Sequence, residues 1–270
     1  MRRAALELLC CPRCHGTLVL REGSAAESVA TGSLYCSRCD RVFPIAQGIA
    51  RFIQPEDLSG LNRRFARFYD VVSYVYAPLT KIFFAFLGGE GRNRRELLDH
   101  LEPAGGRVLE VSIGPGVNLP YLIGSPGVDE VVGLDISLGQ LRRCRSLCRR
   151  RGWAVDLFLG MAEELPFRDA SFDRVLHVGG INFFSDKAKA MREMVRVARP
   201  GAKLVIADET EKGARGCEWT IPGFSLLFEG KRETVTVPVD LVPAGCRDIR
   251  VDTIWRGLGY CLEFRKPATV

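Results

Sequence analysis

Between residues 107 and 208, short apolar runs alternate with longer amphipathic stretches. The first run, Val108–Val111, is of the kind that a buried parallel strand needs. Gly114 and Gly116 follow it, and glycine lets backbone amides come close to a ligand because no Cβ intervenes. A helix is expected to open at Asn118–Pro120. The order of strand, glycine loop and helix predicts the first unit of a doubly wound nucleotide-binding sheet.

A second apolar run, Val131–Asp135, ends in an acid. Its distance from the glycine loop suits a carboxylate that binds ribose hydroxyl groups at the end of the next strand. Nicotinamide enzymes share this arrangement, but their loop reads G-x-G-x-x-G. Here Ser112 stands at the first glycine position and Val117–Leu119 contains no third glycine. The loop therefore favours a nucleoside ligand without a pyrophosphate over a dinucleotide.

The rest of the pattern continues the α/β alternation. Ser137 is a natural N-cap for a helix that ends at Gly152. The segment 211–245 is expected to be irregular because it is rich in glycine, proline and tryptophan. The other expected elements are a strand ending near Phe158, a strand opening at Phe172–Val175, a helix over Glu193–Arg199, a strand over Lys203–Asp208, and a hairpin of Arg250–Trp255 with Tyr260–Arg265.

Two C-x-x-C pairs lie near the N-terminus, Cys11 with Cys14 and Cys36 with Cys39. Four thiolates in two such pairs suit a tetrahedral zinc site. The surrounding segment is too small to bury a core of its own, and metal ligation would offset that deficit. Unligated core cysteines are the less favoured alternative. The neighbouring Cys10 and His15 are expected to be bystanders, because four sulfurs already complete the ligand set.

Three segments follow from these patterns. Residues 1–55 are predicted to form a zinc-ribbon module, and residues 105–270 the ligand-binding α/β domain. Residues 56–104 are predicted to form an N-terminal helical lid between them. The helical character of Leu61–Leu101 is broken near Pro78 and at the glycines that follow.

Composition adds limits on partners and location. The 270 residues carry a net charge of +6, which permits a nucleic-acid or other anionic partner without requiring one. The longest apolar stretch, Tyr74–Leu87, contains Lys81 and is too short to cross a bilayer. Arg2 and Arg3 are followed by Glu7 and a cysteine pair rather than by a signal-peptide core. We therefore expect a cytoplasmic protein without a membrane span, whose ten cysteines do not form a disulfide framework.

Five motifs in sequence order carry a resemblance to a known family. They read E-V-S-I-G-P-G, L-D-I-S, G-M-A-E-E-L-P-F, S-F-D-R-V and A-R-P-G-A-K-L-V-I, between about Phe65 and Asp208. Together they resemble the class I S-adenosylmethionine-dependent methyltransferases, and most closely the ubiquinone and menaquinone methyltransferases. The N-terminal segment resembles the small zinc-ribbon proteins that activate tRNA and protein methyltransferases. The fused arrangement is also similar to rRNA guanine-N1 methyltransferases.

The resemblance implies a doubly wound, seven-stranded Rossmann-like sheet, S-adenosyl-L-methionine as cofactor and a structural zinc. Relatives usually carry an aspartate at the position of Met161, where it binds the adenine amino group; backbone groups of Ala162 or the side chain of Glu163 are expected to replace it. Tyr69 and Tyr76 resemble lid aromatics that shield the cofactor. The expected cofactor-binding residues are Tyr69, Glu110, Ser112, Gly114, Gly116, Asn118, Asp135, Ile136, Met161, Ala162, Glu163 and His177.

His177 is the leading candidate for a catalytic base or acceptor-orienting group, because it lies at the carboxyl end of a predicted strand. Asp208, at the end of the next strand, is the second candidate. A hydrogen-bonded structural histidine and a loop-capping acid are the respective alternatives.

Three functions stay open from the sequence. A methyltransferase with a small-molecule acceptor, aromatic or quinone-like, is favoured by the apolar insertion around Trp219, Phe224 and Phe228. An RNA methyltransferase is favoured by the zinc module and by the arginines of 142–151, which are otherwise a solvated helix face. A methyltransferase-like domain that binds cofactor or a partner without catalysis is the third.

Overall fold

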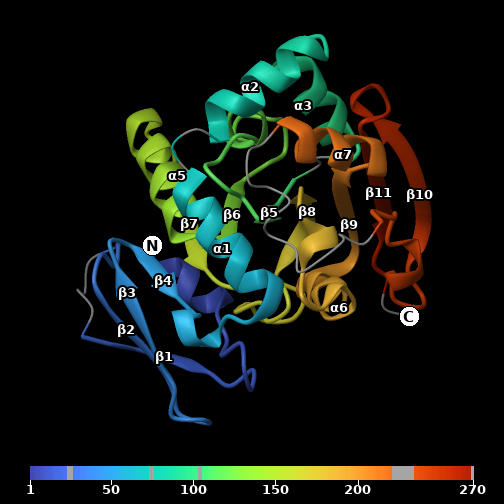
Figure 1. The fold of residues 1–270 in the computed structure, drawn as a ribbon. Helices are drawn as coiled ribbons and strands as arrows, with labels where there is room; N and C mark the ends of the chain where they lie inside the picture. The colour runs from blue at the N-terminus through green and yellow to red at the C-terminus, as the bar shows by residue number, and fades with distance from the viewer. Residues whose placement is uncertain (23–26, 73, 75, 103–104, 221–233, 269–270) are drawn as a thin grey trace.

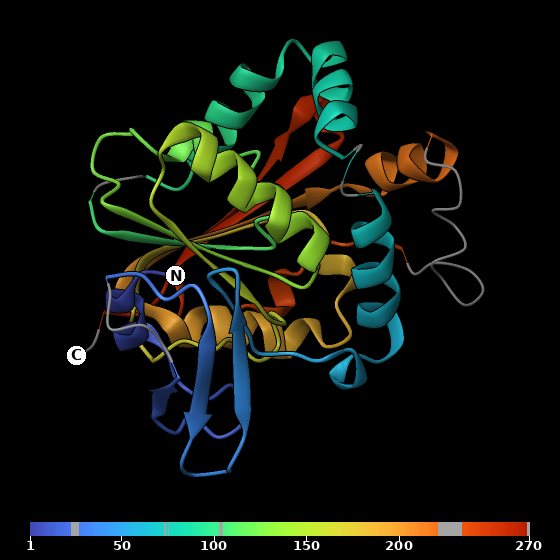
Figure 2. The ribbon, with the colours of Figure 1, turned by 90° about the vertical axis from the view of Figure 1, so that its left-hand side faces the viewer.

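The computed structural model describes residues 1–22, 27–72, 74, 76–102, 105–220 and 234–268. Within this part, the strands form a single sheet in the order β1-β2-β3-β4-β7-β6-β5-β8-β9-β11-β10. Helices cover both faces, with α6 on one side and α3 and α5 on the other (Figures 1 and 2). No helix among these residues is long and apolar enough to cross a lipid bilayer.

The α/β part contributes seven of the strands. Five are parallel, and β11 and β10 close the sheet in antiparallel orientation, as the predicted hairpin requires. The bounds are β5 Arg107–Val111, β6 Glu130–Asp135, β7 Val155–Leu159, β8 Phe172–Val178, β9 Ala198–Glu209, β10 Arg247–Ile254 and β11 Gly259–Arg265.

The N-terminal segment contributes an antiparallel meander that follows the 3-10 helix η1, Arg3–Leu8. Its strands are β1 Leu18–Arg21, β2 Gly32–Cys36, β3 Val42–Ala46 and β4 Ile49–Arg51. Strand β4 then runs parallel to β7, with Ile49 beside Leu157 and Arg51 beside Leu159.

The expectation of a seven-stranded sheet is therefore wrong, because the sheet has eleven strands. The physical reason is the free edge that β7 presents at the end of the α/β sheet. An unpaired strand edge carries a row of unmet N–H and C=O groups. Strand β4 meets these groups, so the four strands of the N-terminal segment extend the α/β sheet instead of forming a separate one.

The helices follow the expected order with shifted boundaries. Ser137 does cap its helix, because its Oγ accepts a hydrogen bond from Gln140 N, and Gly152 ends it in the left-handed conformation. Pro78 lies in the first turn of α2, which tolerates proline, so the break falls before it. The bounds are α1 Gly60–Val72, α2 Tyr76–Phe86, α3 Glu90–Asp99, α4 Leu119–Leu122, α5 Leu138–Arg151, α6 Lys187–Val197 and α7 Glu211–Thr220.

The insertion expected to be irregular begins with the helix α7, which corrects that expectation for its first ten residues. Phe224 and Phe228 lie outside the described residues, as does the side chain of Trp219. Short 3-10 turns complete the chain: η2 Pro55–Asp57, η3 Ile181–Phe183, η5 Val239–Leu241 and η6 Trp255–Gly257.

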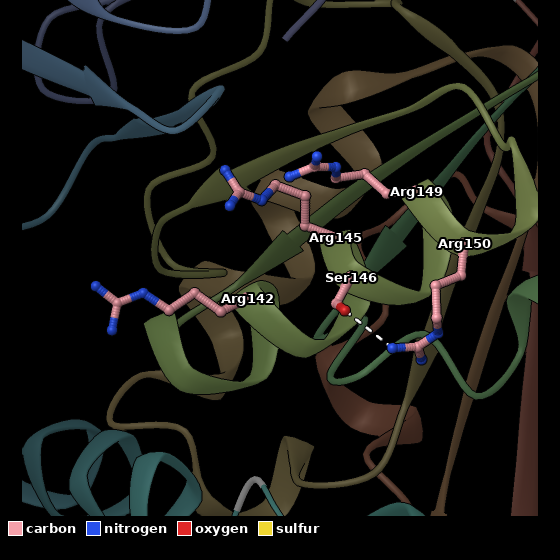
Figure 3. Close-up of a pocket in the computed structure, with 5 residues that line it drawn as sticks. All are labelled: Arg142, Arg145, Ser146, Arg149 and Arg150. Carbon is pink, nitrogen blue, oxygen red and sulfur yellow. Dashed lines mark hydrogen bonds between the residues drawn. The ribbon is translucent and has the colours of Figure 1, made fainter.

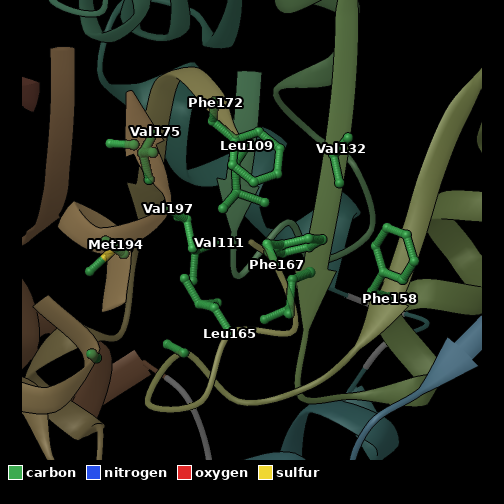
Figure 4. Close-up of a cluster of buried hydrophobic side chains, with 14 of the residues drawn as sticks. Leu109, Val111, Val132, Phe158, Leu165, Phe167, Phe172, Val175, Met194 and Val197 are labelled. Atoms are coloured by element: carbon green, nitrogen blue, oxygen red, sulfur yellow. The ribbon is translucent and has the colours of Figure 1, made fainter. Parts of the chain in front are cut away.

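Two buried hydrophobic clusters lie on opposite faces of the sheet, since successive side chains of a strand point to opposite sides. Leu109 and Val111 belong to the cluster beneath α6, together with Met194 (Figure 4). The same cluster includes Leu34 and Phe43 of the N-terminal segment. The cysteine-bearing module therefore packs into the core of the α/β part. The division of the chain at residues 55 and 104 stays a prediction.

Candidate functional site

The loop after β5 has the backbone shape that a close ligand approach requires. Gly114 and Gly116 both have positive φ, and Ser112 shares this conformation with a φ of 62°. A Cβ on Gly116 would lie 2.8 Å from Leu119 Cδ1 and 2.9 Å from Cys144 Sγ, whereas a Cβ on Gly114 would meet nothing within 4 Å. Gly116 is thus needed for packing, and Gly114 leaves the outer side of the loop accessible.

Asp135 joins the end of β6 to this loop. Its Oδ2 accepts a hydrogen bond of 2.8 Å from Gly114 N, and its Oδ1 accepts one of 2.8 Å from Ser137 N. Burial raises the pKa of the Asp135 carboxyl to about 6, although the backbone donors at Ser137 and Gly114 act in the opposite direction. The two predicted motifs therefore meet at the carboxyl ends of β5 and β6. The adjacent Ile136 is a half-buried residue that packs against the core cluster under α3 and α5.

Glu110 is buried in β5, beside this loop. Its Oε1 accepts a hydrogen bond of 2.6 Å from Asn118 Nδ2, and Asn118 Oδ1 accepts one of 2.7 Å from Arg94 Nη1. The other oxygen, Oε2, is buried with no hydrogen-bond partner among the described residues. Burial raises the pKa of Glu110 to about 7; Asn118 and Arg94 lower it, and Asp135 raises it further.

Arg94 was not predicted from the sequence. It lies in α3 between Arg92 and Arg95, and no periodic or motif signal separates the three. In the fold, Arg94 is buried over the ring of Phe84, while Arg92 and Arg95 are exposed. Only tertiary packing distinguishes them.

Two buried acids beside one glycine loop favour a ligand that carries positive charge, because a cation stabilises the ionised form of both. S-adenosylmethionine carries a sulfonium and an ammonium group on a nucleoside. The orphaned Glu110 Oε2 and the open side of Gly114 fit such a ligand. A pyrophosphate would instead add negative charge next to these acids.

The segment predicted to contact adenine lies after β7. Met161 is half-buried and Ala162 is buried. The Oε1 atom of Glu163 accepts hydrogen bonds from Asn62 Nδ2 at 2.8 Å and from Ser185 N at 3.2 Å. The carboxylate of Glu163 thus links α1 to the loop before α6.

Tyr69 lies in α1 with its ring 6.0 Å from that of Phe65. The end of α1 is held close to the site by Asp70, which accepts hydrogen bonds from Ser137 Oγ at 2.6 Å and from Gly139 N at 2.7 Å. The structure therefore places the Tyr69 helix next to the loop that follows Asp135. The side chain of Tyr76 lies outside the described part of the chain.

His177 is completely buried at the end of β8. Its Nδ1 lies 3.1 Å from the carbonyl oxygen of Val111, so Nδ1 carries the proton and donates it. Its Nε2 is then the acceptor nitrogen, and it has no partner among the described residues. Burial lowers the pKa of His177, while Asp208 and the bond to Val111 oppose this effect, so the imidazole is neutral at pH 7.

Asp208 is also completely buried, and its oxygens are taken by groups of the loop after β8. They accept hydrogen bonds from Gly180 N at 2.9 Å and from Asn182 Nδ2 at 3.1 Å. This arrangement ties the loop at 180–182 to β9.

The four predicted metal ligands come together in the N-terminal module. Cys11, Cys14, Cys36 and Cys39 have all their sulfur atoms within 4.8 Å of one another. Two of the sulfur pairs, Cys11 with Cys39 and Cys14 with Cys36, lie 3.5 Å apart. Tetrahedral zinc with Zn–S distances of about 2.3 Å requires sulfur separations of this order. Cys10 and His15 do not join the cluster, as predicted.

The module is fastened to the α/β part by polar contacts as well as by β4. Arg2 donates to Asp156 from its backbone N at 2.6 Å and from its Nε at 2.8 Å, and its guanidinium also pairs with Glu130. Cys10 N donates to Pro166 O at 3.0 Å. Cys10 thus lies at the interface, one residue from the metal cluster.

A strongly basic face lies on α5. Arg142, Arg145, Arg149 and Arg150 line a shallow hollow with Ser146 (Figure 3). Arg145 also donates to the backbone oxygen and side chain of Gln47 in the N-terminal module.

Comparison with known proteins finds a matching family model for each of the two parts of the chain. Residues 109–206 match the family model described as a methyltransferase domain. Residues 2–48 match the model described as Trm112p-like protein. These matches confirm the resemblance, with S-adenosyl-L-methionine as cofactor and zinc in the cysteine cluster.

Curated relatives are similar mainly over the α/β part. Demethylmenaquinone methyltransferase of Renibacterium salmoninarum is 36% identical over 157 residues, which cover 57% of this chain and 60% of that protein. Phthiotriol/phenolphthiotriol dimycocerosates methyltransferase 1 of Mycobacterium ulcerans is 38% identical over 109 residues, 40% of each protein. The chain thus spans between two fifths and three fifths of these relatives.

Solved structures share the fold at low identity. The cyclase SpnF superposes with a TM-score of 0.59 at 17% identity, covering 78% of this chain and 98% of that one. A complex of the Haloferax volcanii Trm112 methyltransferase activator with a methyltransferase gives a TM-score of 0.50 at 17% identity, covering 68% and 97%. Residues 109–206 therefore belong to the methyltransferase domain family on the class I doubly wound fold, behind an N-terminal Trm112p-like module.

Proposed function

We propose that this protein transfers the methyl group of S-adenosylmethionine to a small apolar acceptor. The observation that carries the proposal is the pair of buried acids at the carboxyl ends of adjacent strands, with Glu110 Oε2 unpartnered beside the loop that Asp135 holds. Open α/β sheets bind ligands at this edge. The cofactor supplies a methyl group that is already activated by the sulfonium, so orientation and electrostatics are left to the protein.

Each site residue then has a role. Asp135 binds the ribose hydroxyls, and Glu110 stabilises the ammonium group, supported by Asn118 and Arg94. The glycine loop, with Ser112, Gly114 and Gly116, lies against the nucleoside. Ile136, Met161 and Ala162 border the adenine. Tyr69, from the helix that Asp70 fastens, excludes water from the sulfonium.

His177 is proposed to orient the acceptor or remove its proton through Nε2, which its bond to Val111 leaves as an acceptor. We assign Asp208 a positioning role, because its oxygens are engaged by the loop at 180–182. Glu163 is likewise assigned to holding α1 in place, which supports Ala162 as the substitute for the missing adenine-binding aspartate.

The acceptor class rests on the relatives. Their names specify demethylmenaquinone and phthiotriol or phenolphthiotriol dimycocerosates, which are apolar quinone or lipid molecules. We therefore propose a quinone-like or lipid-like acceptor. An RNA acceptor is the competing class, and a transfer assay with radiolabelled cofactor separates the two.

Cofactor binding is tested first, by calorimetry with S-adenosylmethionine. We expect Glu110→Gln and Asp135→Asn each to weaken binding by about tenfold or more, the cost of losing a charge-assisted contact. Glu96→Gln, an exposed acid on α3, is the control and should bind as the parent protein does. Equal affinity of all four proteins would refute the site. The fold alone does not fix the reaction, because the cyclase SpnF shares it. Cofactor binding without methyl transfer to any acceptor would therefore support the binding site and refute the proposed reaction.

A further inference from the structure

Helix α2 presents an apolar stripe to the outside of the molecule. Leu79, Ile82 and Phe86 are 50%, 56% and 79% exposed, and their spacing of three and four residues places them on one face. Val71 and Tyr74, just before the helix, are also largely exposed. Contiguous apolar surface of this kind marks an interaction site, whereas single exposed residues do not.

On the side of α2 opposite the stripe, Phe84 is buried. Phe84 packs edge-on against Trp255, with ring centroids 5.4 Å apart, and lies beneath the guanidinium of Arg94. The helix is thus anchored inward through Phe84 and leaves Leu79, Ile82 and Phe86 outside.

The chain around the stripe carries little negative charge, and its nearest acids in sequence are Asp70 and Glu90. Residues 71–89 contain Lys81 and no acid. The guanidinium carbon of Arg143 in α5 lies 3.2 Å from the ring centroid of Tyr74, so the basic helix adjoins the apolar corner. Figure 1 shows α2 at the top of the molecule and α5 at its left. Arg142 is exposed beside Arg143, and no ion pair to it is found within the described part of the chain.

We propose that this corner docks on the surface of an anionic lipid membrane. The apolar side chains of α2 would enter the boundary between headgroups and acyl chains, and the arginines of α5 would contact lipid phosphates. An apolar face flanked by basic side chains is the combination that binds at such an interface.

The other occupants fit less well. An RNA would use the arginines and leave the apolar stripe in water. A second copy of the chain, related by a twofold axis through the stripe, would bring the arginines of both copies together. A neutral apolar partner would leave the basic helix unused.

Co-sedimentation with lipid vesicles tests the proposal without cofactor or acceptor. We expect binding to vesicles of phosphatidylcholine with phosphatidylglycerol, at least about tenfold above binding to phosphatidylcholine alone, and release by high salt. The double variant Ile82→Asp with Phe86→Asp should lose about tenfold or more in binding, because it puts charges into the apolar contact. Arg142→Glu with Arg143→Glu should abolish the preference for the anionic vesicles.

Matched controls come from the N-terminal module, where Val19 and Val42 are 50% and 54% exposed on the β-meander. Val19→Asp with Val42→Asp should bind vesicles as the parent protein does. The proposal fails if the Val19→Asp with Val42→Asp variant loses as much vesicle binding as the Ile82→Asp with Phe86→Asp variant. It also fails if the parent protein binds single-stranded RNA but no vesicle. It also fails if the parent protein forms a dimer in sedimentation velocity that Phe86→Asp dissolves. None of these readouts depends on methyl transfer.

Discussion

Asn62, near the start of α1, donates a buried hydrogen bond of 2.8 Å to Glu163, 101 residues later in the chain. Asp70, near the end of the same helix, accepts from Ser137 and Gly139. Helix α1 is therefore fastened at both ends to loops that follow the carboxyl ends of β6 and β7. Side chains thus hold α1, which belongs to the predicted lid, at the carboxyl ends of these strands.

Removing the first of these fastenings should loosen α1. Asn62→Ala leaves the buried Glu163 carboxylate with only backbone donors, so we expect a loss of about 1–2 kcal/mol in the free energy of unfolding. Amide exchange should quicken across Gly60–Val72. Arg67→Ala, an exposed change in the same helix, is the control. Exchange rates that match between the two variants would show that the Asn62 bond does not hold the lid.

Glu110 should make stability depend on pH. Its pKa is raised to about 7 by burial, so the folded state binds the proton more tightly than the unfolded state, whose glutamate has a pKa of about 4.3. The contribution of Glu110 to the free energy of unfolding is therefore fully present below about pH 4, where the carboxyl is protonated in both states. It is lost as the pH rises through about 7, where the buried carboxyl ionises. Glu110→Gln removes the buried charge, so at pH 8 we expect the variant to exceed the parent in stability by about 3–4 kcal/mol.

Urea denaturation of both proteins at pH 5 and pH 8 measures this difference. Asp135, whose pKa is also raised, remains in both proteins. A parent protein and variant whose stabilities change in parallel between the two pH values would contradict the assignment.

Zinc removal should affect the whole chain, because the cysteine module shares a core and a sheet with the α/β part. Cys36→Ser should lose bound zinc, measured by mass spectrometry of metals, and lower the melting temperature of the single transition. Cys10→Ser, at a buried cysteine outside the cluster, should keep its zinc. Zinc content that survives Cys36→Ser unchanged would contradict the four-sulfur site.

His177→Ala should lower the turnover number by about hundredfold, because it removes the acceptor nitrogen at the end of β8, and leave S-adenosylmethionine affinity nearly unchanged. Since the pKa of His177 is lowered, the parent rate should fall only at pH below about 6.5, where the imidazole becomes protonated. His15→Ala, an exposed change in the N-terminal module, is the control. The rates are measured with a quinone-like or lipid-like acceptor to which the parent protein transfers the methyl group. A variant as fast as the parent would remove His177 from the mechanism.

Local chemistry was enough to predict several features correctly. Cys11 with Cys14 and Cys36 with Cys39 form a cluster because each pair is close in sequence and only the two pairs must meet. Ser137 caps its helix because the cap bond spans three residues. The meeting of Asp135 with the glycine loop was predictable because parallel strands in a doubly wound sheet end at one edge.

The features that the sequence did not reveal all depend on contacts between distant segments. Strand β4 is three residues long, and its pairing with β7 follows from an edge that exists only once the sheet has formed. Arg94 differs from Arg92 and Arg95 only by the surroundings that bury it.

The amino-acid sequence by itself thus determined the α/β class and the four-cysteine cluster, and it predicted the ligand edge, since these depend on spacing along the chain. The tertiary structure alone decided that Glu163 fastens α1 to the sheet, that Asp208 holds a loop, and that the N-terminal strands extend the central sheet. A buried polar group or an open strand edge forms hydrogen bonds with the groups that the fold places beside it. Those groups lie far away along the sequence, as the 101 residues between Asn62 and Glu163 show.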